Sequence, residues 1–462
     1  MAVPVFSRRA SVSSPVPESS LGRGRRDIES WGRYPHGAHR RVLRAWWSDQ
    51  VPACLANAGP ASILPGGLRR SYGDSCLNFG RDLLDCTPLD RFLFADFQRG
   101  ILRCEAGVTL HEILRMVVPR GWFLPVLPGT AHVTLGGAIA NDIHGKNHHR
   151  QGSIGRHLRQ LMLSRSDAPE LLCSPNSEIE LFRATIGGLG LTGVILWAEM
   201  QLKPVSSPWL LARKSVFKSL DEFFYLTAQN DDSEEYTVAW LDGFARSDPQ
   251  GVFFSASHAP APVENHSGEA SLQRHAFPVA RGIPGQCLNP WTIRLFNAAY
   301  RNYQERSTRT KLIHYRSFFF PLDSLDNWNR IYGRGGLVQY QCLLPEDPGI
   351  LRRLLAKISI SGQVSFLMVL KRFGNLASPG ILAFPRPGLT LALDFPMRGR
   401  RTLQLLDELD AIVLPCGGAL YPAKDARMSR AAFQSSFPNW RRFRAAIDPK
   451  CSSSFWRRVT EW

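Results

Sequence analysis

The chain has no long apolar run. No stretch of its 462 residues approaches the roughly eighteen consecutive apolar residues of a membrane-spanning helix. The segment from Met1 to Ser20 also lacks the apolar centre of a secretory signal peptide. We therefore expect a protein without a transmembrane segment or signal peptide. It would lie in the cytoplasm or peripherally at the inner membrane, and the sequence does not decide between the two faces of that membrane.

Cysteine is scarce and scattered. The nine cysteines are odd in number and never stand in a C-x-x-C arrangement. This pattern argues against a disulfide framework and against structural zinc. We expect most of the thiols to be buried as small apolar side chains in a reducing compartment.

Acidic residues are outnumbered by basic ones. The chain carries 39 Asp and Glu against 56 Lys and Arg, a net charge of +17, and nine of the arginines fall within residues 1–44. Residues 1–26 are also rich in Ser and Pro, so we predict a disordered basic tail there. The charge favours anionic partners, either lipid headgroups or a phosphorylated substrate. Nucleic acid is not expected, because no nucleic-acid-binding module accompanies the charge.

Length and patterning predict two α+β blocks. The composition is 44% apolar, and single cores stop growing at about 250 to 300 residues. In the first block, strands are expected at 83–86, 101–106 and 194–200, and a helix at 110–120. In the second, we predict a mobile loop over 259–285 and further strand-like pieces around Trp240 and at 318–320, 339–341 and 366–371.

A helix is predicted over 290–304 in the second block. Trp291, Leu295, Ala298 or Ala299, and Tyr303 recur near helical spacing. We interpret this stripe as core packing, with contact to a substrate or a membrane as the alternative.

Two glycine-rich segments narrow the function most. Residues 66–74 read Gly-Gly-Leu-Arg-Arg-Ser-Tyr-Gly-Asp, and residues 134–149 read Thr-Leu-Gly-Gly-Ala-Ile-Ala-Asn-Asp-Ile-His-Gly-Lys-Asn-His-His. Glycines let the main chain approach a bulky phosphorylated ligand, and their N–H groups form a concave nest for a pyrophosphate. Together the segments indicate a flavin-binding cradle.

Two other readings of these motifs are less favourable. Residues 188–193 match G-x-G-x-x-G, but a β-branched and aromatic run follows where a nicotinamide-binding fold needs a helix. A glycine-rich turn into a strand that closes over a flavin fits better. Asp142, His144, His148 and His149 suggest a metal site, but Lys146 would place a cation in it. We expect no metal, and His148 and His149 to lie in a loop or an interface.

The sequence resembles the vanillyl-alcohol oxidase superfamily of flavoproteins and, within it, the decaprenylphosphoryl-ribose oxidase family. The similarity covers roughly residues 30–460. It is carried by the segments 70–74, 125–130, 142–149, 184–188, 339–341 and 421–427.

The resemblance implies an α+β, two-domain PCMH-type FAD-binding fold. Residues 27–205 would form the FAD-binding domain, and residues 206–418 a substrate domain built on an antiparallel sheet. Residues 419–462 would return to the FAD domain. The FAD would be noncovalent, because relatives that tether it use a histidine where this chain has Arg70. The implied cofactor-binding residues are Pro65, Gly66, Gly67, Leu68, Arg69, Arg70, Ser71, Tyr72, Gly73, Asp74, Ser75, Gly129, Thr134, Leu135, Gly136, Gly137, Asn141, Asp142, Ile143, His144, Ile195 and Tyr421.

The resemblance also implies a substrate and a catalytic set. Oxidising a secondary alcohol requires a proton acceptor near the hydroxyl and positive charge near the flavin ring. We assign Lys424 and His144 as catalytic: Lys424 positions or deprotonates the alcohol, while His144 and Lys146 support the ring. The implied substrate-binding residues are Tyr72, Lys146, Trp240, Gln339, Gln341 and Lys371. Trp240 could instead belong to the core.

The implied reaction is oxidation of the 2′-hydroxyl of a polyprenyl-phosphoryl-β-D-ribose to the 2′-keto sugar. This is the first half of epimerisation to an arabinose donor for cell-envelope glycan. The partners would be the lipid-linked sugar phosphate, an NAD(P)-dependent short-chain reductase and a membrane surface. The alternative is an alditol or sugar-lactone oxidase of the same superfamily, acting on a soluble substrate.

Three departures from the family pattern fall on the substrate side. Ala392 stands in place of a cysteine that captures nitroaromatic inhibitors, so such capture is not expected. Thr390 replaces an asparagine and Phe319 a tyrosine. The reaction class is therefore a firmer expectation than the identity of the sugar.

Overall fold

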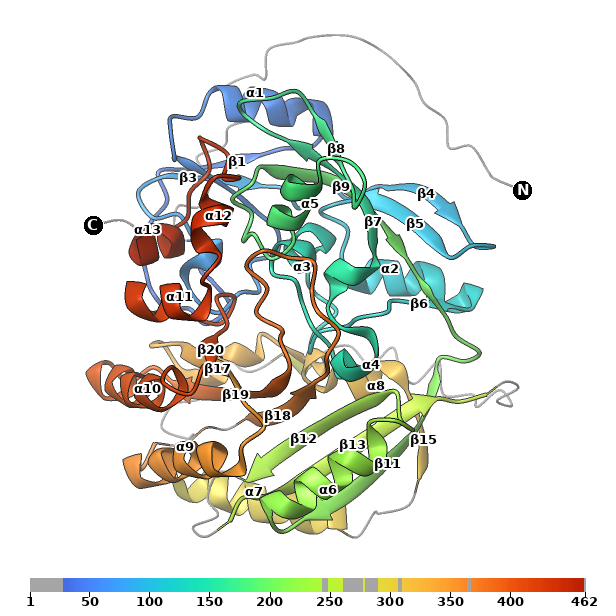
Figure 1. Ribbon diagram of the computed structural model, residues 1–462, viewed down its shortest axis with the longest axis vertical. Coiled ribbons are helices and arrows are strands. Elements are labelled where there is room, and N and C mark those ends of the chain that lie inside the picture. The colour runs from blue at the N-terminus through green and yellow to red at the C-terminus, as the bar shows by residue number, and fades with distance from the viewer. Residues whose placement is uncertain are drawn as a thin grey trace.

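The computed structural model describes residues 28–242, 248–260, 277–278, 290–305, 310–363, 365 and 367–460. The predicted basic tail, 1–26, lies outside the described residues, as does most of the predicted loop 259–285. Within the described residues, helices accompany mainly antiparallel sheets, which confirms the α+β class (Figure 1). None of the described helices is both long and apolar enough to span a bilayer.

A three-stranded parallel sheet begins the fold. Its order is β1 (Arg41–Arg44), β3 (Asp82–Asp85) and β2 (Ile63–Gly66), with α1 (Val51–Ala56) between β1 and β2 in the chain. The central strand is buried along its whole length, and Leu84 packs with Leu43 and Leu55 of the neighbouring elements. Because β2 ends at Gly66, this sheet delivers the first glycine-rich segment.

A five-stranded antiparallel sheet follows. Its order is β4 (Phe92–Asp96), β5 (Ile101–Glu105), β9 (Val194–Gln201), β7 (Leu158–Ser164) and β8 (Leu171–Cys173). One face shares a core with α2 (Leu110–Val117) and α3 (Leu135–Ala140). Thr109 and Glu112 form a capping box that starts α2. The remaining elements here are α4 (His148–Gln151), α5 (Ile179–Thr185) and the pair β6 (Trp122–Phe123) with β10 (Lys203–Pro204).

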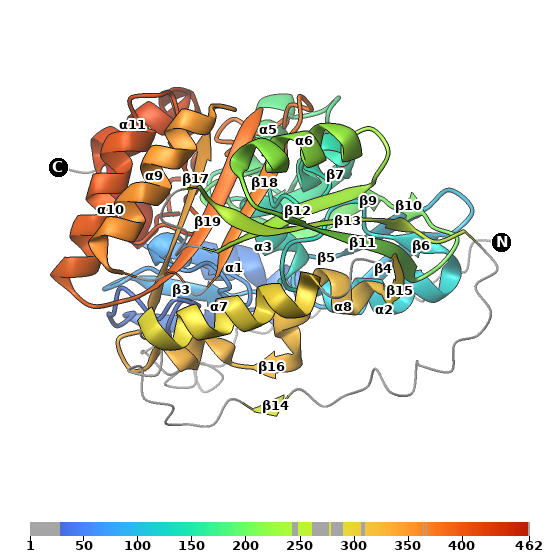
Figure 2. The same ribbon diagram turned by 90° about the horizontal axis from the view of Figure 1, so that it is seen from below.

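An eight-stranded antiparallel sheet makes the lower half of Figure 1. Its order is β15 (Lys311–His314), β11 (Trp209–Phe217), β13 (Gln250–His258), β12 (Tyr236–Asp242), β18 (Met368–Phe373), β19 (Gly388–Pro396), β17 (Leu337–Leu344) and β20 (Ala419–Leu420). Helices α6 (Leu220–Asn230), α9 (Pro348–Ser361) and α10 (Arg400–Val413) bury its apolar face. Helices α7 (Pro290–Glu305) and α8 (Tyr315–Phe319) lie on the opposite side (Figure 2).

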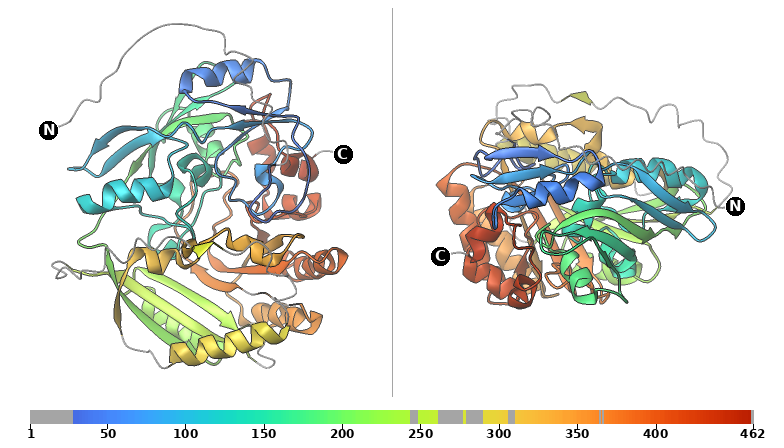
Figure 3. Two further views of the ribbon diagram at one scale, coloured as in Figure 1. Left: turned by 180° about the vertical axis from the view of Figure 1, so that it is seen from behind. Right: turned by 90° about the horizontal axis from the view of Figure 1, so that it is seen from above.

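The C-terminal helices return to the beginning of the chain. These are α11 (Arg430–Ser436), α12 (Trp440–Arg444) and α13 (Ser454–Thr460), which lie beside the N-terminal strands in two further views (Figure 3). The backbone of Cys451 forms an isolated parallel β-bridge with Ile63 of β2. The Ser454 hydroxyl accepts a hydrogen bond from the Phe79 amide at 2.9 Å. The short parallel pair β14 (Phe277–Pro278) and β16 (Leu325–Asp326) completes the described elements.

Most predicted elements are present within one or two residues. The strands expected at 83–86, 101–106 and 194–200 correspond to β3, β5 and β9, and those around Trp240 and at 339–341 to β12 and β17. The helices expected at 110–120 and 290–304 correspond to α2, extended by a 3-10 turn, and α7. Of the strand expected at 366–371, Phe366 lies outside the described residues and 368–371 belong to β18. The eight described cysteines are free thiols, five of them buried.

Three local predictions were wrong. Residues 318–320 were expected as a strand, but Phe318 and Phe319 end helix α8, because their rings fill the core beneath Tyr236. His148 and His149 were expected in a loop or interface, but they begin α4, and His148 is fully buried. The stripe on α7 was expected to be core, yet Trp291 and Leu295 point outward, with 78% and 74% of their surface exposed.

Candidate functional site

A cavity of about 460 Å³ opens between the glycine-rich segments and the eight-stranded sheet. One wall comes from residues 65–76 and from the segment that leads through α3 to His144. The other wall is the face of the sheet opposite to α6, α9 and α10, around β17, β18 and β19. Segments far apart in the sequence therefore meet at one concave surface.

The two glycine-rich segments interlock. A Cβ on Gly67 would overlap the Thr134 hydroxyl oxygen, which itself accepts a hydrogen bond from the Gly137 amide and caps α3. Arg69 adopts the left-handed conformation with φ of 52° and turns the chain. A Cβ on Gly129, by contrast, would meet no protein atom within 4 Å and would occupy space inside the cavity. The cradle is thus kept open by residues without side chains.

Several buried polar atoms around the cavity have no hydrogen-bond partner among the described residues, although Arg69 Nη1 lies 4.0 Å from an Asp85 carboxylate oxygen. They are Arg69 Nη1, Ser75 Oγ and His144 Nδ1. Buried polar groups are normally hydrogen-bonded, so these atoms indicate a polar ligand. With the open glycine cradle, they fit the phosphorylated dinucleotide expected from the sequence.

Most of the predicted cofactor residues line this cavity. These are Pro65, Gly66, Gly67, Leu68, Arg69, Arg70, Ser71, Tyr72, Ser75, Gly129, Thr134, Gly136, Gly137, Asn141, Ile143, His144, Ile195 and Tyr421. Gly190 and Gly193 line it as well, and the strand β9 follows them as the sequence predicted. Gly73, Asp74, Leu135 and Asp142 lie behind the wall.

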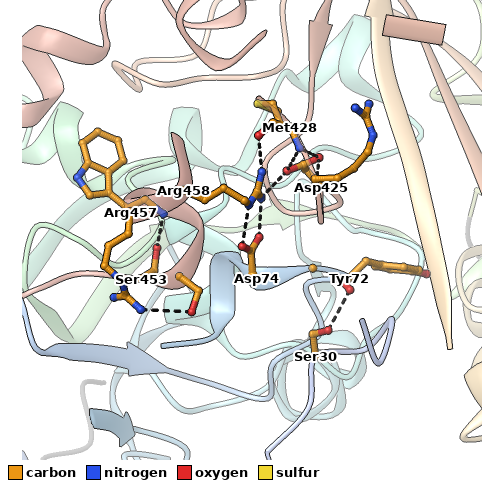
Figure 4. Close-up of polar contacts among 12 residues, drawn as sticks. Ser30, Tyr72, Asp74, Asp425, Met428, Ser453, Arg457 and Arg458 are labelled. Atoms are coloured by element: carbon orange, nitrogen blue, oxygen red, sulfur yellow. Dashed lines mark hydrogen bonds and ion pairs between the residues drawn. The ribbon is translucent and has the colours of Figure 1, made fainter. Parts of the chain in front are cut away.

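Gly73 and Asp74 attach the cradle to the C-terminal part of the chain (Figure 4). A Cβ on Gly73 would overlap the carbonyl oxygen of Asp425. Asp74 accepts two hydrogen bonds from Arg458, at 2.7 and 3.0 Å, and Arg458 also donates to Asp425 at 2.8 Å. Asp74 and Asp425 are both nearly fully buried. Arg458 therefore joins the cradle to the turn that carries Lys424.

The other two residues behind the wall are structural as well. Leu135 is buried in the core beneath the five-stranded sheet. Asp142, in the left-handed conformation with φ of 41°, accepts hydrogen bonds from the Gly155 amide at 3.0 Å and the Ser378 hydroxyl at 2.5 Å. Burial raises the pKa of this carboxyl group.

The strand register brings the predicted substrate residues onto one face of the sheet. Gln341 of β17 pairs with Ala392 of β19, and Ala392 pairs on its other side with Val369 of β18. Val369 in turn pairs with Trp240 of β12. One step along, Gln339 faces Asp394, and Lys371 faces Thr390. Side chains two residues apart on a strand share a face. Gln339, Gln341, Lys371 and Ala392 accordingly all line the cavity.

Lys424 enters the cavity from the turn after β20. Its backbone amide donates to the Tyr421 carbonyl at 3.0 Å, and its Nζ lies 3.9 Å from the centre of the Tyr72 ring. Burial lowers the pKa of Lys424, the negative charge of Asp394 opposes this, and Lys371 adds to it. A lysine in this setting can lose its proton near neutral pH.

Asp394 is the main functional candidate that sequence analysis missed. It is fully buried on β19, its Oδ1 accepts a hydrogen bond from Gln339 Nε2, and its Oδ2 has no partner among the described residues. Burial raises its pKa, opposed by the Gln339 hydrogen bond and by Lys424. Residues 390, 392 and 394 share one face of β19, but this would have placed Asp394 beside the cavity only if the pairing of β19 with β17 had been known.

His144 is held as a neutral imidazole. Gln341 Nε2 donates to its Nε2 at 3.0 Å, so the ring proton sits on Nδ1. Burial lowers the pKa of His144 well below its ordinary value, and Lys371, His148 and Lys424 lower it further. His144 therefore offers a hydrogen-bond donor, while positive charge must come from lysines.

Lys146 and Trp240 stand behind the cavity wall. Lys146 Nζ donates to the Phe318 carbonyl and lies 4.3 Å from the centre of the Phe318 ring. Burial, followed by the charge of Lys371, lowers its pKa to about 7. Trp240 packs edge-on against Tyr300 of α7, with ring centres 5.0 Å apart.

No group of three or more His, Cys, Asp or Glu side chains is placed to hold a metal ion in the part of the chain that the structure describes. The rings of His144 and His148 pack against Phe373 instead, at 4.7 and 4.4 Å between centres. Burial lowers the pKa of His148 to about 3.

The cavity also has walls that the sequence did not indicate. One group of such residues is contributed by the start of the described chain and by the region around β16. It comprises Trp31, His132, Leu322, Asp323, Leu325 and Trp328. Among them, Leu325 of β16 is 39% exposed.

Comparison with known proteins gives consistent results. Residues 48–168 match the family described as FAD binding domain. The decaprenylphosphoryl-β-D-ribose oxidase of Mycolicibacterium smegmatis is 34% identical over 409 residues, which cover 85% of this chain and 88% of that protein. An uncharacterized protein of Streptomyces coelicolor is 35% identical over 357 residues, covering 74% and 96%. A putative D-arabinono-1,4-lactone oxidase of Neurospora crassa is 26% identical over 125 residues, covering 27% and 22%.

Proposed function

The chain belongs to the decaprenylphosphoryl-β-D-ribose oxidase family of FAD-dependent oxidoreductases acting on a CH–OH group, and on this basis we propose its substrate and mechanism. It oxidises the 2′-hydroxyl of a polyprenyl-phosphoryl-β-D-ribose to the 2′-keto sugar. The observation that carries the proposal is the position of Lys424. This buried lysine has a lowered pKa and faces the cavity between the glycine cradle and the polar face of the sheet.

We propose that FAD and the substrate are bound by two different domains. Residues 27–205 would bind FAD, residues 206–418 the substrate, and residues 419–462 would complete the FAD domain. The arrangement of the sheets supports this. The three- and five-stranded sheets come from residues before 205, and the eight-stranded sheet comes from β11 onward. Arg458 then ties the end of the chain back to Asp74.

We infer that FAD is bound without a covalent bond. Arg70 lies at the position where tethered relatives have histidine, its Nε donates to the His132 carbonyl at 3.1 Å, and its guanidinium lies 4.1 Å from the centre of the Trp31 ring. A guanidinium is not a nucleophile for such a bond. Acid precipitation of the yellow protein should leave the flavin in the supernatant, whereas a yellow pellet that keeps its colour through washing would contradict the inference.

Lys424 is the proposed proton acceptor. Bound FAD would supply the two-electron oxidation by accepting a hydride. A neutral Lys424 takes the hydroxyl proton, and the resulting ammonium is stabilised by Asp394 and by the face of the Tyr72 ring. Asp394 acts through Lys424, because its side chain is bonded to Gln339 and is not among those that line the cavity.

The other cavity residues orient the sugar and supply charge. The amides of Gln339 and Gln341 face the cavity and suit sugar hydroxyl groups. Burial lowers the pKa of Lys371 to about 8, so it is mostly protonated at neutral pH and supplies positive charge. His144 contributes a neutral hydrogen-bond donor at Nδ1.

Asp394→Asn is expected to move the pH dependence of substrate oxidation to lower pH. The rate rises with pH as Lys424 loses its proton, and Asp394 raises the pKa of that lysine. Removing the negative charge lowers this pKa, so the midpoint of the rising limb should fall by about one pH unit or more. The pH profile of kcat/KM measures the shift.

The matched control is Asp221→Asn, which removes a carboxylate that is 80% exposed and far from the cavity. It should leave the midpoint unchanged. A midpoint that stays in place or rises in Asp394→Asn would show that Asp394 does not set the protonation of the acceptor.

The preferred substrate distinguishes the proposed function from that of an alditol or sugar-lactone oxidase. The partial match to a lactone oxidase concerns the same superfamily, in which an alditol or sugar-lactone oxidase would act on a soluble substrate. Turnover of a polyprenyl-phosphoryl ribose should exceed that of free alditols and lactones at equal concentration. The reverse order would favour the alternative.

The proposed setting follows from the product. A keto sugar must be reduced to reach the arabino epimer, so the partner would be an NAD(P)-dependent short-chain reductase. This would complete the arabinose donor for cell-envelope glycan. The polyprenyl substrate also implies work at a membrane surface, in the cytoplasm or at either face of the inner membrane, with oxygen or a quinone as electron acceptor.

A further inference from the structure

Helix α7 carries two large apolar side chains on its outer side. Of its side chains that the structure describes, Ile293, Asn297 and Gln304 are buried. Trp291 and Leu295, one helical turn apart, point away from the sheet and are 78% and 74% exposed. A helix of a monomeric soluble protein ordinarily buries its apolar side.

Polar contacts hold α7 in this orientation. Asn297 Nδ2 donates to Asp242 at 2.9 Å, and Arg301 donates to Asp242 at 3.4 Å and to Gln250 at 2.7 Å. Lys214 of β11 donates to Gln304 at 2.6 Å. These bonds anchor α7 from its middle to its C-terminal end, so rotating the helix to hide Trp291 would break them. The outward apolar side is therefore a built feature of the fold.

Helix α7 lies on the same side of the molecule as β16, which contributes Leu325 to the cavity lining (Figure 2). Seen from below, α7 and β16 lie on the same side of the eight-stranded sheet, with α6 on the other (Figure 2). The view from behind shows α7 and the region of α8 and β16 facing the reader (Figure 3). Leu325 of β16 lines the cavity and is partly exposed. Tyr300 of α7 packs on Trp240, which shares the sheet face that lines the cavity.

The chain segment that contains α7 is basic in sequence. Residues 281–316 contain seven Arg or Lys residues and a single acidic residue, Glu305. Arg294, on α7 itself, is exposed beside the Trp291 ring. An exposed tryptophan and leucine beside the exposed Arg294 match the two requirements of a surface that rests on an anionic bilayer. The apolar side chains enter the headgroup boundary, and the cations attract acidic lipids.

We propose that the outer side of α7, centred on Trp291 and Leu295, docks the protein on an anionic lipid bilayer. The proposal rests on the lipid-linked substrate proposed above, and it adds which surface of the protein contacts the membrane. In this orientation β16, whose Leu325 lines the cavity, is on the side of the protein that faces the membrane (Figure 2). The sugar of a polyprenyl-phosphoryl substrate can then enter the cavity while the prenyl chain stays in the bilayer.

Vesicle co-sedimentation of the full-length, FAD-loaded protein tests this proposal. The parental protein should sediment with vesicles of phosphatidylcholine and phosphatidylglycerol, less with phosphatidylcholine alone, and less at high salt. Trp291→Ser/Leu295→Ser should weaken the partition by about tenfold or more, because each lost side chain removes buried apolar area. Flavin content and thermal midpoint should stay at parental values.

The matched control is Tyr225→Ser/Ile360→Ser. It removes an aromatic and an aliphatic side chain that are 61% and 83% exposed, on α6 and α9 at the other face of the sheet. This variant should bind vesicles like the parent. The proposal is overturned if the parent does not sediment with anionic vesicles, or if both double variants sediment equally. Loss of binding to the purified reductase with vesicle binding intact would assign α7 to a protein partner instead.

A separate measurement distinguishes failure of docking from failure of the proposed function. A short-chain, water-soluble phosphoryl-ribose should reduce the flavin of the parent and of Trp291→Ser/Leu295→Ser at the same rate. If it reduces neither protein while vesicle binding behaves as expected, the proposed function fails and the docking surface stands.

Discussion

Lys424→Ala should retain FAD and lose substrate oxidation by about 10²- to 10⁴-fold, the range that general acid–base catalysis contributes. The Lys424 side chain faces the cavity, and its backbone turn is held by the hydrogen bond to the Tyr421 carbonyl, which alanine keeps. The cradle residues are untouched, so the visible flavin spectrum should match the parent. Anaerobic stopped-flow measurement of flavin reduction gives the rate directly.

Two comparisons sharpen this prediction. Lys357→Ala removes an exposed lysine that pairs with Glu408 at 3.4 Å, and it should keep the parental rate. A small primary amine added to Lys424→Ala should restore part of the rate, because it can take the proton in the space left by the side chain. A variant that holds flavin and oxidises substrate at the parental rate would remove Lys424 from the mechanism.

Arg458→Met is expected to lower the stability of the protein and its hold on FAD. The guanidinium donates to the buried carboxylates of Asp74 and Asp425, and its own side chain is 26% exposed. Methionine has a similar length but leaves both carboxylates without their partner. Breaking a buried ion pair in this way typically costs about 3 kcal/mol or more. We expect the thermal midpoint to fall by roughly 5 °C or more.

The matched control for Arg458 is Arg442→Met. Arg442 makes a bidentate pair with Glu180, but the two side chains are 49% and 62% exposed. An exposed pair contributes about 0 to 1 kcal/mol, so this variant should melt close to the parent. Flavin fluorescence during heating reports unfolding and FAD release together. Equal midpoints for both variants would show that the Asp74–Arg458–Asp425 network does not stabilise the cradle.

The flavin cradle was predictable because its signals are local. Gly66 ends strand β2 and Gly67 follows it, and Thr134 caps a short helix, so neighbouring residues alone define both turns. The capping box of Thr109 and Glu112 likewise marks the start of α2 within four residues. In such segments, residues that interact are also close together in the sequence.

The substrate side was harder to predict, because it depends on strand register. Asp394 acquires its role from pairing with Gln339, 55 residues away in the chain, and from the approach of Lys424 on a later turn. Trp240 and Lys146 were expected in contact with substrate, but the packing of Tyr300 and Phe318 places them behind the wall.

Helix α7 shows why spacing alone does not decide which side of a helix is buried. The period of Trp291 and Leu295 correctly predicted a helix. The side that packs was decided by Asp242, Gln250 and Lys214, which bond to Asn297, Arg301 and Gln304 across long sequence distances. The apolar stripe was therefore assigned to the core, although it lies on the surface.

Anaerobic mixing of the purified protein with polyprenyl-phosphoryl-β-D-ribose tests the central claim most directly. The account predicts that the visible flavin absorbance is lost within the time of one turnover, with formation of the 2′-keto sugar, and that free alditols and sugar lactones bleach it far more slowly. A flavin spectrum that stays unchanged with the lipid-linked ribose, in protein that carries a full complement of FAD, would contradict it.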